Sequence, residues 1–445
     1  MNRYYGLKGF LILMVLFFHL PAFPVFGQMP LTLEESISLA LKNSLTISAA
    51  KHGAKGAQAQ KREAMTGFGP KFSTTYGYTR INEEPSFHFP GNPPLIPEQT
   101  IVSGTVNNYN WTVEARQPLF TGGGILANYQ AAKIGEDIAV VEETAVSLDV
   151  VQDVKTAYYD VLRAQRLEES MRQAVEMLKG HADVAQNFFR VGLIPKNDLL
   201  QADVQLANGK QSLTRATNAV LLAKARFNMV LKREMSTEVV LVDILGYQTY
   251  SPSFDESLDV ARKNRPELKI SALQVQRAGK MVRVLQSEYF PVVSVSGSYS
   301  RYGDHPSVSG SDYREMESWQ VMALASWNFW EWGKTKFRVD AGKARENQAV
   351  DQAGHLEDQV TLQIKNAYLM LKEAESQIAV SQKVIDQAEE NFRISEARYR
   401  ERVARSTEVL DAQSLLTRAQ SDYANALADY QIQLARLHRA MGVME

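Results

Sequence analysis

Long stretches of the chain repeat apolar residues at alternating spacings of three and four, which is the pattern of helices that pack side by side. Residues 125–189 follow this pattern and contain no proline, a residue that costs about 3 kcal/mol inside a helix. A helix over this range would be roughly 100 Å long at 1.5 Å per residue, far longer than a helix of an ordinary globular domain. Residues 198–232 alternate apolar spacings of three and four more strictly, which forms a continuous apolar seam along one side of a helix. This seam predicts a second helix that returns antiparallel to the first.

The same pattern occurs twice, which indicates that the chain is a duplication of one unit. The segment LEESI at 33–37 recurs as FDESL at 254–258, 221 positions later, whereas residues 157–158 recur as 367–368, only 210 positions later. The first unit therefore holds a loop that is 11 residues longer. Each unit is expected to contain a helix, a strand, a loop, a second strand, a very long helix, a tight turn and a return helix.

The predicted helix lengths are matched to one another. A helix over 33–65 and the return helix over 198–232 have together nearly the residue count of the long helix between them. Two short helices stacked end to end can therefore run beside one long helix. The expected result is an antiparallel helical wall that has the same thickness along its whole length.

Four short segments, two in each unit, alternate between apolar and polar residues: 70–80, 108–119, 291–300 and 318–328. Phe72 and Tyr76 share one face of the first segment, and Lys71 lies on the other. Such alternation is typical of outer membrane barrel strands, which turn apolar residues to lipid and polar residues to the lumen. The fourth segment is ambiguous, because Met322 and Leu324 fall on its polar face.

Four strands are too few to enclose a lumen, and unpaired strand edges are not tolerated in lipid. We therefore expect several chains to share one barrel. The loops that join the strands fit an outer surface, because residues 83–110 are rich in proline and residues 301–317 are polar with glycines. The stretch between the units, 233–253 with a possible strand at 239–242, is expected to cross the outside of the helical wall.

The N-terminus has the pattern of a secretory signal peptide. Arg3 and Lys8 precede an apolar run over 9–20, and the small residues Val25 and Gly27 indicate cleavage after Gly27. No later window holds about 18 consecutive apolar residues, so a membrane-spanning helix is not expected. The absence of cysteine excludes disulfides and a lipid-bearing N-terminal Cys. The predicted organisation is a signal peptide at 1–27, a first repeat at 28–251 with its helical hairpin at 125–232, and a second repeat at 252–445 with its helical hairpin at 334–441.

Composition and motifs argue against several other functions. The formal net charge of −1 does not favour nucleic acid or another polyanion as a partner. The seven histidines are scattered without metal-ligand spacing, and Gly122–Gly124 lacks the following Lys-Ser/Thr of a phosphate loop. Trp330 and Trp332 are expected to be interfacial aromatics rather than a binding cage. We expect no enzyme activity, no catalytic residue, no cofactor and no bound metal.

Three motifs follow one another in the duplicated chain: Gln117-Pro118-Leu119-Phe120-x-Gly122-Gly123, then Arg190-Val191-Gly192-Leu193, then Arg398-Tyr399 with Val409-Leu410-Asp411-Ala412. Together they resemble the TolC-like outer membrane efflux proteins over essentially the whole mature chain. The resemblance implies an α+β membrane protein, a homotrimer whose 12-stranded outer membrane β-barrel continues into a long periplasmic α-helical barrel. It also implies a passive export duct of a tripartite efflux or type I secretion system. The implied partners are a periplasmic adaptor, an inner membrane pump of the RND or ABC type, and outer membrane lipid.

The two predicted helical turns would lie at the periplasmic tip of such a duct. The resemblance assigns docking of the adaptor to the turn residues Val191, Gly192, Leu193, Ile194, Val403 and Ala404. In a simpler interpretation, Gly192 and Pro195 only end one helix and start the next, and the two interpretations are compatible. Arg402 stands where the family usually has glycine, which leaves open whether the second tip docks in the usual way.

Glu408 and Asp411 are three residues apart and therefore lie on one face of the second return helix. Asp198 is the counterpart of Glu408 in the first unit. In a trimer these carboxylates would form acidic rings at the narrow end of the tunnel, which resembles the closed periplasmic aperture of the family. Such rings favour cations, and mutual repulsion raises carboxylate pKa values. Arg405 and Tyr399 are candidates for contacts that latch neighbouring helices in the closed state.

Two alternatives stay open. The acidic residues could serve only to stabilise a helix N-terminus, with Ser406 or Thr407 as its cap. The whole chain could also be a periplasmic coiled-coil adaptor or scaffold, although that class does not predict paired strands with aromatic outer faces. A ligand-gated porin fits less well, because porins lack helices of about 65 residues. The sequence does not specify the exported substrate, which could be a drug, a metal, a peptide or a secreted protein.

Overall fold

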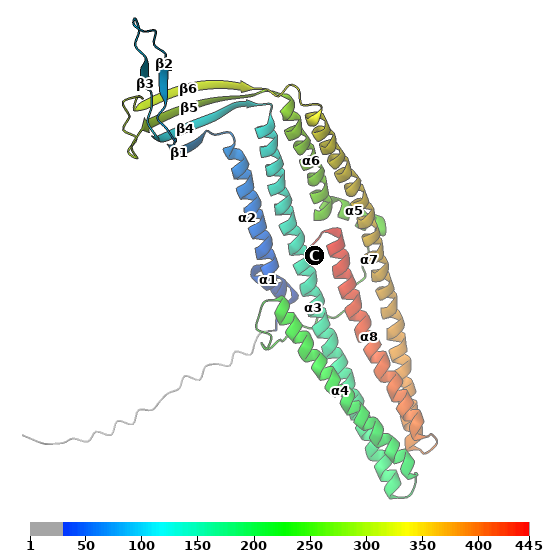
Figure 1. The fold of residues 1–445 in the computed structure, drawn as a ribbon. Coiled ribbons are helices and arrows are strands. Elements are labelled where there is room, and N and C mark those ends of the chain that lie inside the picture. Colours follow the sequence, from blue (N-terminus) through cyan, green and yellow to red (C-terminus); the bar gives the residue numbers. More distant parts are fainter. Residues whose placement is uncertain (1–29, 445) are drawn as a thin grey trace, which may run out of the picture.

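The long axis of the molecule is formed by two helices of 67 residues each, α3 (Gly124–Arg190) and α7 (Lys334–Arg400) (Figure 1). The structure is a computed structural model that describes residues 30–444, so the signal peptide predicted at 1–27 lies outside the described residues. Both helices are free of proline, which permits this length. The long helix predicted at 125–189 is confirmed.

Each long helix starts where the chain leaves a strand and ends in a tight turn to a return helix. The starting residues Gly123 and Gly333 have φ angles of 84° and 83°, which glycine adopts without the steric cost that a Cβ atom would add. The return helices are α4 (Lys196–Val230) and α8 (Ser406–Met441). The two units thus contain equivalent helical hairpins.

Four shorter helices complete the helical part: α1 (Leu33–Asn43), α2 (Leu45–Thr66), α5 (Phe254–Asn264) and α6 (Pro266–Gln286). Thr32 and Ser253 begin α1 and α5 with capping boxes, which is why the repeated sequence signal is found there. The prediction of one helix over 33–65 is wrong. The helix breaks at Ser44, because its hydroxyl accepts a hydrogen bond from the amide of Ile47 and so caps α2. In the second unit, Pro266 starts a new helix at the equivalent point.

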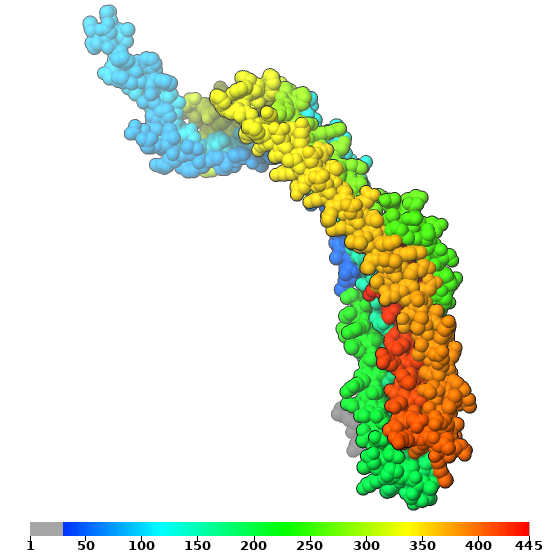
Figure 2. All heavy atoms as spheres, turned by 90° about the vertical axis from the view of Figure 1, so that its right-hand side faces the viewer, coloured from blue at the N-terminus to red at the C-terminus, as the bar shows by residue number. Residues whose placement is uncertain are grey.

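The helices form a narrow, bent wall (Figures 1 and 2). The long helix α3 contacts α2 and α4 of its own unit along successive parts of its length, and it also contacts α6 and α8 of the second unit. The other long helix, α7, packs against α6 and α8. The predicted stacking of two short helices beside one long helix is therefore confirmed. None of the helices within residues 30–444 combines the length and the apolar character needed to cross a lipid bilayer.

An antiparallel sheet with the order β1-β4-β5-β6 lies at one end of the wall, and its strands are β1 (Lys71–Arg80), β4 (Asn107–Thr121), β5 (Val292–Gly303) and β6 (Glu317–Ser326). A short 3₁₀ turn, η1 (Ser287–Tyr289), leads from α6 towards β5. One row across the sheet pairs Thr74 with Val113, Val113 with Tyr299, and Tyr299 with Trp319. Within residues 30–444, β1 and β6 have no further strand on their outer edges, so the sheet is open.

The two faces of the sheet differ as the alternation predicts. Lys71, Arg116, Ser296 and Met322 form one row on the polar face, where each is the register partner of the next. Met322 and Leu324 lie on this face, which explains why the last strand was ambiguous from sequence. The opposite face carries the aromatic side chains. Phe72, Tyr76 and Trp319 on its edge strands are exposed in the isolated chain, and the central strands β4 and β5 are mostly half-buried.

A small hairpin, β2 (Ser86–Phe89) paired with β3 (Gln99–Val102), projects from the far end of the sheet (Figure 1). It lies within the proline-rich loop over residues 83–110, for which no strands were predicted. Its apolar face consists of Phe87 opposite Ile101, and five prolines interrupt residues 83–110. The alternation is therefore too short to predict strands.

The segment that joins the two units packs around the middle of the helical wall. Leu31 and Leu241 form a single parallel bridge, so the strand expected at 239–242 is reduced to one pair. The hydroxyl of Tyr158, a fully buried residue of α3, donates to the carbonyls of Leu31 and Val242 at 3.1 and 2.7 Å. The largest apolar cluster within residues 30–444 lies at this level and contains residues of both units. The linker therefore fastens the two units together.

Candidate functional site at the helical turns

The two helical hairpins close with the same turn. The amide of Gly192 donates to the carbonyl of Phe189 at 2.9 Å, and the amide of Arg402 donates to the carbonyl of Tyr399 at 3.0 Å. The φ angles are 74° at Gly192 and 66° at Arg402. The arginine thus keeps the turn that glycine favours, at a steric cost of roughly 1–2 kcal/mol. Its guanidinium carbon lies 5.8 Å from the centroid of the Phe188 ring, a cation–π contact that offsets part of this cost.

The tip residues predicted to dock an adaptor fall into two groups. Val191, Leu193 and Val403 are exposed, with 64%, 45% and 65% of their surface accessible. Ile194 instead packs against the small apolar cluster inside the first hairpin, and Ala404 is half-buried. The exposed apolar surface at this end therefore comes from both turns.

Glu408 joins the second turn to the helix that follows it. Its Oε1 accepts a hydrogen bond from the amide of Arg405 at 3.2 Å, and its Oε2 accepts one from Nη1 of Arg398 at 3.3 Å. Arg405 is the residue that precedes α8, so the prediction of Ser406 or Thr407 as the cap is wrong. The carboxylate of Glu408 reaches back to the turn, as in a capping box. The exposed ion pair with Arg398 adds little stability, about 0–1 kcal/mol.

The other predicted aperture residues lie close by on three helices. Asp198 is half-buried in the first turn of α4, and Asp411 is exposed on α8. Tyr399 is buried near the end of α7, with 4% of its surface accessible. Burial raises the pKa of Tyr399, and the carboxylate of Asp198 raises it further. The carboxylate of Asp198 therefore acts electrostatically on Tyr399 of the other repeat, whereas Asp411 is exposed on the surface.

One residue of this region was missed from the sequence. Nε2 of His181 on α3 lies 2.8 Å from Oγ of Ser406, and its ring centroid lies 4.9 Å from that of Tyr399. This contact also explains why the Ser406 hydroxyl does not cap α8. Burial lowers the pKa of His181, and the carboxylate of Glu396 acts in the opposite direction.

A sequence signal for His181 does exist. It lies on α3 three residues after Leu178 and four before Ala185, both of which are buried. A histidine in a position that the helical seam reserves for apolar residues indicates a buried polar contact. A search for metal-ligand spacing does not detect it, because its partner belongs to the other repeat.

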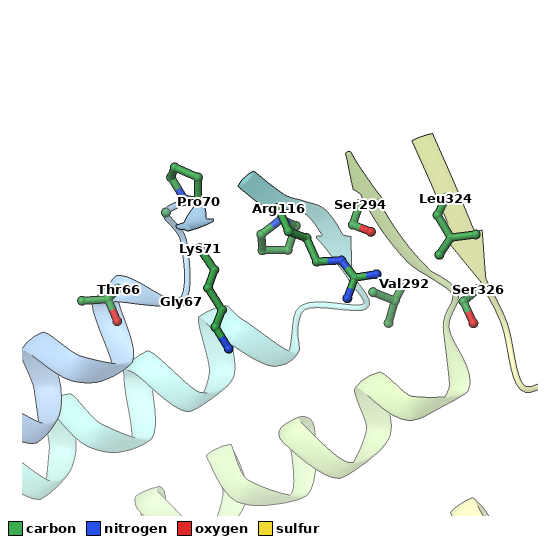
Figure 3. A pocket seen from close by; sticks show the side chains of 11 residues that line it. Thr66, Gly67, Pro70, Lys71, Arg116, Val292, Ser294, Leu324 and Ser326 are labelled. Atoms are coloured by element: carbon green, nitrogen blue, oxygen red, sulfur yellow. The ribbon is translucent and has the colours of Figure 1, made fainter. Parts of the chain in front are cut away.

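At the opposite end, a cavity of about 730 Å³ lies between the polar face of the sheet and the helix ends (Figure 3). Lys71 and Arg116 are register partners on neighbouring strands, and both side chains extend from the sheet into this space (Figure 3). Leu324 lines the cavity from β6. Two cations per chain therefore face the same hollow.

Exposed aromatic residues follow β6, where the chain turns into α7. Trp327, Phe329, Trp330 and Trp332 are all exposed, and the rings of Trp330 and Trp332 meet edge to face at 5.7 Å. Trp332 has a φ of 53°, a conformation that Gly122 adopts in the first unit with a φ of 60°. Exposed tryptophans beside an apolar sheet face are typical of a membrane–water interface.

Residues 30–444 contain no group of three or more His, Cys, Asp or Glu side chains placed to hold a metal ion.

Comparisons with known proteins agree with this architecture. Protein CyaE of Bordetella pertussis is 25% identical over 216 residues, which are 48% of this chain and 46% of that relative. The cobalt-zinc-cadmium resistance protein CzcC of Cupriavidus metallidurans is 22% identical over 276 residues, which are 62% of this chain and 60% of that relative. The chain thus spans only about half to three-fifths of these relatives.

A solved structure extends the likeness to nearly the whole chain. The outer membrane protein VceC of Vibrio cholerae superposes with a TM-score of 0.77 at 17% identity, covering 93% of this chain and 97% of that chain. The sequence profile of the outer membrane efflux protein family matches residues 36–231 and 257–443, one range in each repeat. The chain therefore belongs to the outer membrane efflux protein family.

Proposed function

We propose that three copies of this chain form an outer membrane duct, which exports substrates as part of a tripartite efflux or type I secretion system. The observation that carries the proposal is the open four-stranded sheet, which continues directly into a wall built on two 67-residue helices. Three copies would supply about twelve strands, enough to close a barrel with an open lumen. Closure would pair the edges of β1 and β6 between neighbours and remove the unpaired backbone groups from lipid.

The surfaces of the chain fit the partners of such a system. The aromatic face of the sheet, with the tryptophans after β6, would contact outer membrane lipid. The exposed Val191, Leu193 and Val403 would meet the periplasmic adaptor, which couples the duct to an inner membrane pump of the RND or ABC type. Ile194 and Ala404 would support these tips from within the hairpins. The shared backbone turn at Gly192 and Arg402 supports docking by both tips.

The domain organisation follows from the duplication. We propose a first repeat at 28–251 and a second at 252–445, which together build one passive conduit without a catalytic residue. The transported substrate would move through the lumen, and the pump would supply the energy.

We infer that the end with the helical turns is the periplasmic aperture. Glu408 and Asp411 lie on the same helix face and would form two acidic levels in a trimer. Asp198 and Tyr399 would hold the two repeats together in the closed state, which is supported by the electrostatic influence of Asp198 on Tyr399 across the repeats. Arg405 would act through its amide, which holds Glu408 in place.

The test begins with localisation and assembly. The protein should be recovered in the outer membrane fraction and, in detergent, should have three times the mass of one mature chain by light scattering. Incorporated in planar bilayers, it should form channels. Recovery in the soluble periplasmic fraction without detergent would refute the duct and support the coiled-coil scaffold. A monomeric mass in detergent would refute the shared barrel.

A further inference from the structure

A buried polar cluster joins the two repeats just above their turns. We name it the histidine cluster, and it consists of His181 on α3, Tyr399 on α7 and Ser406 on α8. The accessible surfaces of these residues are 8%, 4% and 2%. The contact of 2.8 Å between Nε2 of His181 and Oγ of Ser406 is the hydrogen bond that links the repeats here. The cluster therefore crosses the line along which the second hairpin would separate from the first.

One hydroxyl of the histidine cluster has no hydrogen-bond partner among the described residues. The Ser406 hydroxyl is engaged by His181, and the Tyr399 hydroxyl is buried without a hydrogen-bond partner among residues 30–444, although it lies near Ser406. Buried polar groups normally have partners, so an unsatisfied hydroxyl makes this contact less stable than an apolar one of similar size. The histidine cluster is therefore suited to a contact that must open.

The charged groups around His181 come from three elements. Glu396 on α7 favours the protonated imidazole, and the electron-rich face of Tyr399 would do the same. Asp198 on α4 acts on Tyr399, and α8 contributes the neutral hydroxyl of Ser406. Burial outweighs the carboxylate of Glu396, so the pKa of His181 stays below its ordinary value.

We propose that His181 is a further residue of the periplasmic aperture, a neutral buried contact that holds the second hairpin to the first and releases it when the imidazole takes up a proton. The proposal rests on the aperture inferred above, where contacts between the two repeats maintain the closed state. It makes opening of the duct responsive to periplasmic acidification.

The direction and size of the effect follow from linkage. The pKa of His181 is lowered in the closed state, whereas a released imidazole has its ordinary pKa of about 6.5. The closed state is therefore most stable above pH 6.5, and it loses stability relative to the released state as the pH falls below this value. At pH 5.5, one unit below that value, a released imidazole is about tenfold more often protonated than neutral. The released state therefore gains up to about tenfold over the closed state between pH 7.5 and pH 5.5.

A single introduced thiol can report this release, because the chain has no cysteine. Leu410 is buried four residues after Ser406, on the same face of α8, so Leu410→Cys should become accessible when α8 leaves α3. Ala202 is fully buried in the seam of the first hairpin, so Ala202→Cys serves as the matched control. The rate of reaction with 4,4′-dithiodipyridine, which modifies thiols at acidic pH, is measured on detergent-solubilised protein of unchanged elution volume.

The expected result is a ratio of the Leu410→Cys rate to the Ala202→Cys rate that rises about five- to tenfold from pH 7.5 to pH 5.5. His181→Gln places an amide nitrogen near the position of Nε2 but does not titrate, so in this background the ratio should stay constant. His181→Ala should raise the ratio at both pH values. A flat ratio in the wild-type background, or a rise that survives His181→Gln, would overturn the proposal. Since the assay requires no conduction, failure to form channels would count against the duct and not against this contact.

Discussion

Removal of one hydroxyl should loosen the linker between the repeats. The Tyr158 hydroxyl is shared between the carbonyls of Leu31 and Val242, and its ring is packed edge to face against Tyr159 and Phe227. Tyr158→Phe keeps the ring and its apolar contacts. The change therefore isolates the hydrogen bonds that hold the linker to α3.

The magnitude can be worked out from the remaining partners. The carbonyl of Leu31 also accepts a hydrogen bond from the amide of Val242 at 3.2 Å, and it keeps this bond in the variant. Loss of its second hydrogen bond, from Tyr158, therefore costs about 0.5–1.5 kcal/mol of stability. The carbonyl of Val242 loses the contact at 2.7 Å in a partly buried setting, which costs about 1–3 kcal/mol. A total of about 1.5–4.5 kcal/mol corresponds to an increase of at least about tenfold in the local opening equilibrium.

Hydrogen exchange read by mass spectrometry on the peptide that contains Val242 measures this opening directly. Tyr159→Phe is the matched control, because it removes the same group from the next residue, which is also buried but is not bonded to the linker. Tyr159→Phe should leave the exchange of this peptide unchanged. If Tyr158→Phe changes the exchange less than twofold, the Tyr158 hydroxyl does not hold the linker and the reasoning is refuted.

Three further predictions concern the two ends of the proposed duct. Glu408→Gln combined with Asp411→Asn should reduce the preference for cations, measured as a smaller reversal potential in planar bilayers under a KCl gradient; unchanged single-channel behaviour would remove both from the aperture. Lys71→Glu combined with Arg116→Glu should raise the cation preference in the same assay, because the two cations would be replaced by anions in the lumen; no shift would mean that the polar face does not line it. Arg402→Gly should remove the backbone strain of about 1–2 kcal/mol at the positive φ of this residue, and it should lose about 0.5 kcal/mol from the cation–π contact with Phe188. The net gain in stability should raise the apparent Tm by a few degrees. A lower Tm would show that the contact with Phe188 outweighs the strain.

Features that repeat along the chain could be predicted from the sequence. The absence of proline between Pro118 and Pro195, together with the apolar seam, was sufficient for the long helix, because helix length depends on local composition. Duplication strengthened the prediction, since two weak strand patterns at equivalent positions support each other. The helix break at Ser44 was missed because a serine in a helical pattern only becomes a cap through its own backbone geometry.

Features that depend on contacts between the repeats could not be predicted in this way. Asp198 and Tyr399 belong to different repeats, and no sequence pattern indicates that the carboxylate acts on the tyrosine. The contact of His181 with Ser406 spans 225 positions, and only the packed hairpins place the two side chains side by side. Pairing of this kind is set by tertiary packing, which local periodicity does not encode.

The open sheet ends in two unlike edges, β1 on one side and β6 on the other. Copies that close a ring through such edges join head to tail, so each junction uses β1 of one copy and β6 of its neighbour. A copy with one damaged edge would still join on its intact side and would then block closure of the ring. In a cell that makes intact and damaged copies in equal amounts, only about one three-membered ring in eight would be wholly intact, so edge mutations should be dominant.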